Sequence, residues 1–167
     1  MSATIDCQAV SAKIESYRDQ GLQWLTDAIR FRSVQGNEQE QQAYWKAVLE
    51  GLGLPAEYRE IPDSLMQDPD YCHNENECSY AGRYNLLSVW GRGQGKRLIV
   101  QSHSDVVPAD DWDGFTPKWD GEYVWGRGAT DCKGCQVSAL LALKALKELG
   151  YEPAGTLELQ FVIEEEP

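Results

Sequence analysis

The stretch LIVQSHSDVVP, residues 98–108, places an apolar run directly before a histidine and an aspartate, and it ends in a proline. Its first three residues are typical of an apolar strand, and His103 and Asp105 follow where that strand would end. Open α/β sheets bind their ligands in a crevice at the carboxyl ends of the strands. We therefore expect a strand that ends at a functional site containing His103.

The composition is that of a globular domain with a substantial core. The chain has 167 residues, of which 42% are hydrophobic, and its net charge of −12 comes from 27 acidic and 15 basic side chains. This charge argues against nucleic-acid or anionic-membrane partners, which require a basic surface. No apolar run resembles a membrane span or a secretory signal, so we expect a cytoplasmic protein. Five cysteines, an odd number, argue against a disulfide framework.

Helical periodicity dominates the first third of the chain. Residues 9–31 carry apolar side chains at helical spacing with Gly21 as a weak point, and they predict one long helix. A second helix is expected over residues 37–52, with Asn37 as its N-cap and Glu40 completing a capping box. A short strand should follow at 57–61. Residues 62–82 are polar and lack periodicity, which predicts a long loop or insertion; it contains His73, the only other histidine.

The remaining pattern alternates strands with a helix. Residues 84–90 and 97–101 are expected to form a hairpin, and 121–125 a short strand. A strongly apolar helix is expected over 133–149, followed by an inner strand over 156–163. A helix between two strands of like direction is a crossover connection. The predicted fold class is α/β, a mixed sheet flanked by helices.

Metal-binding residue types stand at three separate places where a strand or turn ends. These are His103, Asp131 and the run Glu164 to Glu166, and imidazole nitrogen with carboxylate oxygen suits a zinc-like ion. Each position has an ordinary alternative: a hydrogen-bonded structural histidine, a helix N-cap at Asp131, and a solvated acidic face. Their arrangement, one for each successive structural unit, favours a shared metal site.

These motifs, in this order, resemble those of a known metallopeptidase and amidohydrolase family. It includes acetylornithine deacetylase, succinyl-diaminopimelate desuccinylase, aminoacylase and carboxypeptidase G. The matching segments are HSDVVP at 103–108, Trp112 and Pro117, GRGATD at 126–131 with Lys133 and Gly134, and Glu165 with Glu166. A weaker likeness extends to residues 31–33 and Asn85, so the resemblance covers most of the chain.

The resemblance implies a role for each of five residues. His103 would bind one zinc ion, Asp131 would bridge two, and Glu166 would bind the other; cobalt could replace zinc. Asp105 would steady the His103 ring, as ligand histidines require. Glu165 would be the general base that accepts a proton from the attacking water.

Two structural expectations follow from these roles. In a regular strand, Glu165 and Glu166 would point to opposite faces, so the last strand must end near Glu164 if both are to reach the metals. The resemblance also implies a cis peptide bond between Asp131 and Cys132.

The sequence departs from the family pattern at Cys132 and Cys135. The family usually has methionine or another small residue at the first position and glycine at the second. The resulting Cys-x-x-Cys leaves a redox role or a thiolate-zinc role as alternatives.

The resemblance implies that residues 1–167 are the N-terminal part of a catalytic domain. A lid domain that dimerises, the rest of the catalytic domain and further metal ligands would lie beyond Pro167. The expected activity is hydrolysis of the amide bond of an N-acyl amino acid, as in acetylornithine deacetylase, with the 167-residue chain itself nearly inactive. A dipeptidase or carboxypeptidase, or a non-catalytic remnant that binds a metal or a partner, is the alternative.

Overall fold

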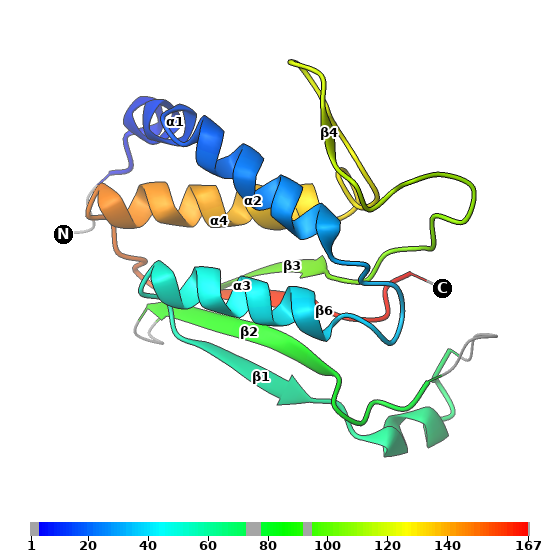
Figure 1. Cartoon of the computed structure of the whole chain (residues 1–167). Helices are drawn as coiled ribbons and strands as arrows, with labels where there is room; N and C mark the ends of the chain where they lie inside the picture. Colours follow the sequence, from blue (N-terminus) through cyan, green and yellow to red (C-terminus); the bar gives the residue numbers. More distant parts are fainter. Residues whose placement is uncertain (1–3, 73–77, 92–94, 167) are drawn as a thin grey trace.

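The computed structural model describes residues 4–72, 78–91 and 95–166. His73 and most of the turn expected between residues 90 and 97 lie outside these ranges. Figure 1 shows a sheet with helices packed on it and a narrow ribbon that projects from the rest of the chain.

A four-stranded mixed sheet forms the centre of the fold. Its order is β1 (Ala56–Glu60), β2 (Tyr84–Gly91), β6 (Thr156–Val162) and β3 (Arg97–His103). β6 pairs antiparallel with β2 and parallel with β3. The predicted α/β class with a mixed sheet is confirmed.

The hairpin expected between residues 84–90 and 97–101 is wrong, because β6 lies between these two strands. The sequence TLELQFV of β6 has the apolar character of an inner strand, as predicted. In that position Leu159 and Phe161 are buried on the core side beside Leu86 of β2. The pairing of β6 with a strand on each side, together with burial of Leu159 and Phe161, replaces the local pairing that the short 90–97 connection suggested.

Two helices pack directly on the sheet. α4 (Lys133–Glu148) connects the β3 side of the chain to β6, and α3 (Gln39–Gly51) lies against β1 and β2. Figure 1 shows them, together with α2, in the same layer. The core between helices and sheet includes Trp45, Leu49, Leu140 and Phe161, all almost completely buried.

The N-terminal helix is broken where the sequence pattern did not indicate a break. α1 (Cys7–Glu15) and α2 (Arg18–Arg30) replace the single helix expected over 9–31. The Ser16 hydroxyl donates to the Lys13 carbonyl, so it competes with the helical backbone bonds there. Gly21 lies within α2 and is buried. It allows α2 to approach α4 closely, because a Cβ at this position would lie 2.9 Å from a Leu141 methyl group.

The expected cap of the second helix is also wrong. α3 has Glu38 as its N-cap residue, without a side-chain capping bond, instead of Asn37. The Glu38 carboxylate instead accepts hydrogen bonds from the Gly36 backbone and from the buried Arg83. This tertiary ion pair replaces the local capping box.

The remaining segments are short. In the described part of residues 62–82 there is one 3₁₀ turn, η1 (Asp63–Gln67), and the Asp63 side chain accepts a hydrogen bond from the Tyr80 backbone. β4 (Lys118–Trp119) and β5 (Val124–Trp125) form the projecting ribbon in Figure 1, so the strand expected over 121–125 is shorter than predicted. All five cysteines are unpaired.

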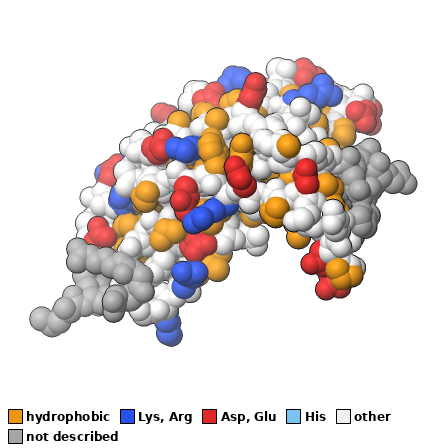
Figure 2. Space-filling view, turned by 90° about the horizontal axis from the view of Figure 1, so that it is seen from below, with side chains coloured by type: hydrophobic (Ala, Val, Ile, Leu, Met, Phe, Trp, Pro, Cys, Tyr) orange, Lys and Arg blue, Asp and Glu red, His pale blue; other side chains and the backbone are white. Residues whose placement is uncertain are grey.

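Acidic and basic side chains are interspersed with apolar ones on the face seen in Figure 2. In the described part of that face, lysines and arginines do not form a continuous area. Among the described helices, none has both the length and the apolar character that crossing a bilayer requires.

Candidate metal centre

The five predicted site residues come from three segments that meet at one end of the sheet. His103 is the last residue of β3, Asp105 follows it in a buried loop, and Asp131 stands just before α4. Glu165 and Glu166 follow β6, which ends at Val162 as predicted. The parallel pairing of β3 with β6 places both carboxyl ends at the same edge, and the Ser104 backbone N–H donates to the Val162 carbonyl across it.

The His103 ring is fixed at both nitrogens. Nδ1 lies 2.9 Å from the Asp105 backbone carbonyl, and Nε2 lies 2.9 Å from Asp131 Oδ1. A carbonyl oxygen can only accept, so Nδ1 carries a hydrogen and Nε2 faces the carboxylates. Glu165 is the next carboxylate, with an oxygen 3.7 Å from Nε2. This is the ring orientation that a metal ligand requires.

The Asp105 carboxylate is completely buried, and its two oxygens have different surroundings. Oδ2 accepts a 2.7 Å hydrogen bond from the Glu166 backbone N–H. Oδ1 has no hydrogen-bond partner and lies 3.8 Å from His103 Nδ1. Asp105 therefore contacts the ring more closely through its backbone carbonyl than through the carboxylate expected from the sequence.

The three consecutive glutamates point in different directions. Glu164 adopts a left-handed backbone conformation (φ 62°) and forms an ion pair with Arg83 at 2.6 Å, away from His103. A ligand oxygen of Glu165 and one of Glu166 lie within 4.8 Å of each other and of a His103 ring nitrogen. The irregular backbone at Glu164 thus allows two successive carboxylates to share a site, as the ending of β6 predicted.

Burial and neighbouring charges in this site shift the pKa values of several side chains. Burial lowers the pKa of His103, but the hydrogen bond to Asp131 and the nearby acidic groups outweigh it, and the net pKa is raised. Burial raises the pKa of Asp105. Burial also raises the pKa of Glu166, and the charges of Asp131, Glu165 and Asp105 add to that rise. A cation in this position would relieve the repulsion among the carboxylates.

The donor set fits a divalent metal ion. Among the described residues, two groups have ligand atoms that all lie within 4.8 Å of one another: His103 with Glu165 and Glu166, and His103 with Asp131 and Cys132. One imidazole nitrogen with carboxylate oxygens is a common zinc ligand set. In such centres a second hydrogen bond commonly orients the ligand histidine, and here the Asp105 backbone carbonyl accepts it from Nδ1.

Several supporting residues were not identified as such from the sequence. Gln136 on α4 is buried and donates to the His103 carbonyl and the Ser104 hydroxyl. Ser33 donates to the Ser104 carbonyl at 2.7 Å. The sequence did offer one signal for Gln136: it is a polar residue within the apolar pattern of residues 133–149. A buried amide in such a position requires hydrogen-bond partners.

The N-terminal end of α4 is anchored by a buried lysine. Lys133 is fully buried, and its ammonium group donates to the carbonyls of Ala28 and Phe31 at 2.9 and 2.7 Å. The peptide bond between Asp131 and Cys132, just before this anchor, is cis, in agreement with the expectation from the sequence. Asp131 is not the N-cap of α4, since that position is Cys132, which makes no capping bond.

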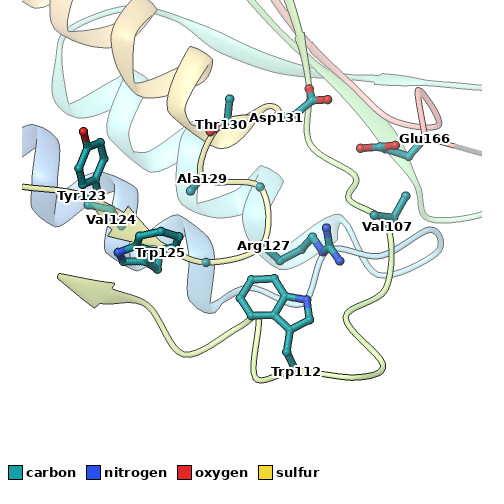
Figure 3. Close-up of a pocket in the computed structure, with 12 residues that line it drawn as sticks. Val107, Trp112, Tyr123, Val124, Trp125, Arg127, Ala129, Thr130, Asp131 and Glu166 are labelled. Carbon is teal, nitrogen blue, oxygen red and sulfur yellow. The ribbon is translucent and has the colours of Figure 1, made fainter. Parts of the chain in front are cut away.

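An open cleft of about 510 Å³ lies beside these ligands. Figure 3 shows Asp131 and Glu166 at one end of it and aromatic side chains from the loop and the β5 region at the other. The Arg127 guanidinium lies 5.4 Å from the centroid of the Trp112 ring and donates to the Pro108 carbonyl. Its Nε has no hydrogen-bond partner.

The sequence signature of peptidase family M20/M25/M40 matches residues 99–167, the segment that contains every ligand of this centre. The match covers residues 99–167 only, and the fold together with this segment supports a likeness to the M20 metallopeptidases. The resemblance expected from the sequence is confirmed.

Similar proteins are peptidases and acyl-amino-acid hydrolases. A β-Ala-Xaa dipeptidase of Lactobacillus delbrueckii subsp. lactis is 38% identical over 96 residues, which are 55% of this chain and 19% of the relative. A succinyl-diaminopimelate desuccinylase of Rhizorhabdus wittichii is 42% identical over 85 residues, 49% of this chain and 21% of the relative.

The solved structure of the dipeptidase Dug1p from Saccharomyces cerevisiae superposes with a TM-score of 0.72 at 25% identity. The superposition covers 93% of this chain and 34% of that protein. The chain therefore spans only about a fifth to a third of the length of these relatives.

Proposed function

We propose that this chain is the N-terminal part of the catalytic domain of a zinc-dependent hydrolase that cleaves the amide bond of an N-acyl amino acid. The observation that carries the proposal is the convergence of His103, Asp131, Glu165 and Glu166 at the edge where β3 and β6 end. The match of residues 99–167 to peptidase family M20/M25/M40 supports hydrolysis as the reaction.

Each residue has one task in the proposed reaction. His103 and Glu166 would each hold one of two zinc ions, and Asp131 would lie between them. Bound zinc supplies a Lewis acid that polarises the scissile carbonyl and lowers the pKa of water. Asp105 keeps the His103 ring oriented through Nδ1. Glu165, 61% exposed at the rim, accepts the proton of the attacking water and passes it to the leaving nitrogen.

The cleft beside the ligands suits a small substrate that carries a carboxylate. Trp112, Tyr123 and Trp125 are among its lining residues, and the half-buried Arg127 supplies a positive charge beside them. A dipeptide meets the same description, and the dipeptidases among the similar proteins favour a dipeptidase as the second candidate.

We further propose that residues beyond this segment complete the enzyme. The relatives are three to five times longer than the region matched, which leaves room for the additional ligands and a dimerising lid domain. The 167-residue chain would then show little or no activity. Five unpaired cysteines support a reducing, cytoplasmic location.

The decisive experiment is an assay of the full-length protein with zinc or cobalt against N-acetylornithine, other N-acyl amino acids and dipeptides. Hydrolysis of the acyl amino acids with a higher kcat/KM supports the first candidate, and preference for dipeptides supports the second. Absence of hydrolysis by the metal-loaded protein would contradict the enzyme proposal. It would favour the alternative, a non-catalytic protein that binds a metal or a partner.

Replacing the proposed base tests its assignment. In the full-length protein, Glu165→Gln should lower kcat by about 10²- to 10⁴-fold, because it removes the proton acceptor while preserving the shape of the side chain. Zinc content, measured by atomic absorption, should be unchanged. Glu57→Gln on the exposed strand β1 is the matched control and should retain full activity. A Glu165→Gln enzyme with near-normal kcat would exclude Glu165 as the base.

A further inference from the structure

We infer that Cys132 contributes a sulfur ligand to the metal centre, next to His103 and Asp131. The sulfur of Cys132, a His103 ring nitrogen and an Asp131 carboxylate oxygen all lie within 4.8 Å of one another. Ligand atoms around one tetrahedral zinc ion have separations within this limit, since zinc binds nitrogen and oxygen at about 2.0–2.2 Å and sulfur at about 2.3 Å. The inference rests on the proposed metal centre and adds a ligand to it.

The position of Cys132 in the chain makes this contact stable. Asp131 and Cys132 are consecutive, and the anchored end of α4 begins at the next residue. Cys132 is half-buried, whereas Cys135 is exposed. The sulfur therefore faces the site from a rigid helix end.

The Cys132 sulfur accepts a hydrogen bond from a buried hydroxyl. The Ser102 hydroxyl, one residue before His103, donates to this sulfur at 3.0 Å. The Cys135 thiol donates instead to the Thr130 carbonyl, 3.6 Å away. Donors directed at a sulfur stabilise it as an electron-pair donor, which is the state of a bound thiolate.

Binding requires loss of the Cys132 S–H hydrogen. The S–H bond breaks, its proton passes to solvent, and the sulfur electron pair forms the bond to the metal. No oxidant or reductant is involved. A thiolate in the set favours thiophilic ions such as Zn²⁺, Co²⁺ and Cd²⁺ over Mg²⁺ or Mn²⁺.

Cobalt spectroscopy of the 167-residue chain tests this inference, with a phosphine reductant to keep the thiols reduced. Titration with Co²⁺ should produce visible ligand-field bands together with a near-ultraviolet sulfur-to-cobalt charge-transfer band. Cys132→Ser should abolish the charge-transfer band and weaken cobalt binding about tenfold or more. Cys135→Ser is the matched control and should retain the band, because a serine hydroxyl can donate to the Thr130 carbonyl in the same way.

A second measurement does not depend on the folding of a variant. Bound Zn²⁺ should protect Cys132 of the unmodified chain from alkylation, detected by peptide mass spectrometry, while the exposed Cys135 remains reactive. Equal alkylation of both cysteines with and without zinc would overturn the inference.

The spectra separate failure of this inference from failure of the proposed function. Ligand-field bands that disappear in His103→Ala, without any charge-transfer band in the unmodified chain, would refute the sulfur ligand and leave the metal centre standing. A charge-transfer band that survives in Cys132→Ser would likewise refute it. Absence of all cobalt bands would contradict both the sulfur ligand and the metal centre in this chain.

Discussion

A buried arginine sets the direction of the glutamate run at the metal centre. Arg83 is only 3% exposed and forms ion pairs with both Glu38 and Glu164, while Gln35 also donates to Glu164. With Glu164 held on this side, the chain turns so that Glu165 and Glu166 face His103. An ion-pair cluster outside the metal centre therefore contributes to its geometry.

Removing this arginine should be severely destabilising. Arg83→Met leaves two carboxylates, Glu38 and Glu164, buried without their cation, and the free energy of unfolding should fall by about 3–5 kcal/mol. Urea denaturation measures the change. Arg59→Met is the matched control, because the Arg59–Glu57 pair is exposed, and it should change stability by less than about 0.5 kcal/mol. Equal effects of the two variants would show that the buried cluster contributes nothing special.

Lys133 should make stability rise with pH. Burial lowers the pKa of Lys133 from its ordinary 10.5 to about 7. Between these values the unfolded chain binds a proton that the folded chain has lost, so the free energy of unfolding increases as pH rises. From pH 7 to pH 9 the metal-free chain should gain up to about 2 kcal/mol from this group.

The variant Lys133→Met isolates this contribution. It lacks the titrating group, so its stability should change less between pH 7 and pH 9 than that of the unmodified chain. It should also be less stable at both values, because the carbonyls of Ala28 and Phe31 lose their donor. Parallel pH dependences in urea denaturation would show that Lys133 is not the group responsible.

At the scale of elements, the start of α4 is packed against the preceding loop without space for a side chain. A Cβ at Gly134 would lie 2.3 Å from the Ala129 carbonyl oxygen. Ala129 lies two residues before Asp131, so this close approach couples the start of α4 to the loop that carries the proposed metal ligand. The position of α4 therefore determines the position of this carboxylate.

Gly134→Ala should displace α4 and destabilise the chain by about 1–3 kcal/mol. In the full-length protein it should also weaken zinc binding, because Asp131 shifts with the loop. Gly51→Ala at the end of α3 is the matched control: nothing lies within 4 Å of its Cβ, and stability should be unchanged or slightly higher. Thermal unfolding of both variants gives the comparison, and a stable Gly134→Ala would disprove the tight packing.

The elements differ in how well the sequence predicted them. α4 and β6 were predicted correctly because their apolar patterns are strong and the apolar residues of both elements pack in the core. The cap at Glu38 was missed because it depends on Arg83, which is distant in sequence. The break at Ser16 has a local contribution, the hydrogen bond of its hydroxyl to Lys13, and a distant one, the hydrogen bond of the neighbouring Tyr17 to Glu148, which the periodicity does not indicate. Strand order was missed for the same reason, since β6 pairs with strands more than fifty residues away.

The site was more predictable than the sheet. His103, Asp131, Glu165 and Glu166 were all identified from the sequence, and the structure brings them together. The supporting contacts of Gln136 and Arg83 could not be predicted, because a polar residue in a buried segment does not by itself indicate its partner. The metal-binding and catalytic roles assigned to His103, Asp131, Glu165 and Glu166 remain predictions.

At the scale of the whole molecule, the edge of the sheet formed by β3 exposes apolar side chains. Among the strands that the structure describes, β3 pairs with β6 alone, and Leu98 and Ile99 on it are 59% and 49% exposed. An edge strand with apolar side chains is a template for pairing with another chain. We expect the 167-residue chain to self-associate as its concentration rises.

Charge on this edge should suppress that association. Ile99→Lys should reduce the associated fraction in sedimentation velocity runs with little change in thermal stability, because Ile99 is half exposed. Tyr123→Lys on the projecting ribbon, where the side chain is 58% exposed, is the matched control and should not reduce it. A chain that stays monomeric at high concentration would contradict the edge as an association site.

The central place of β6 also has a consequence for the order of folding. β6 is the last strand of this segment, yet it lies between β2 and β3 in the sheet. β2 and β3 therefore do not pair with each other. During synthesis, β3 must wait for residues 156–162 before it can join the sheet, and contacts this distant in sequence form slowly. Glu165 and Glu166 emerge immediately afterwards. The nascent chain thus completes this four-stranded sheet and gains Glu165 and Glu166 in one step.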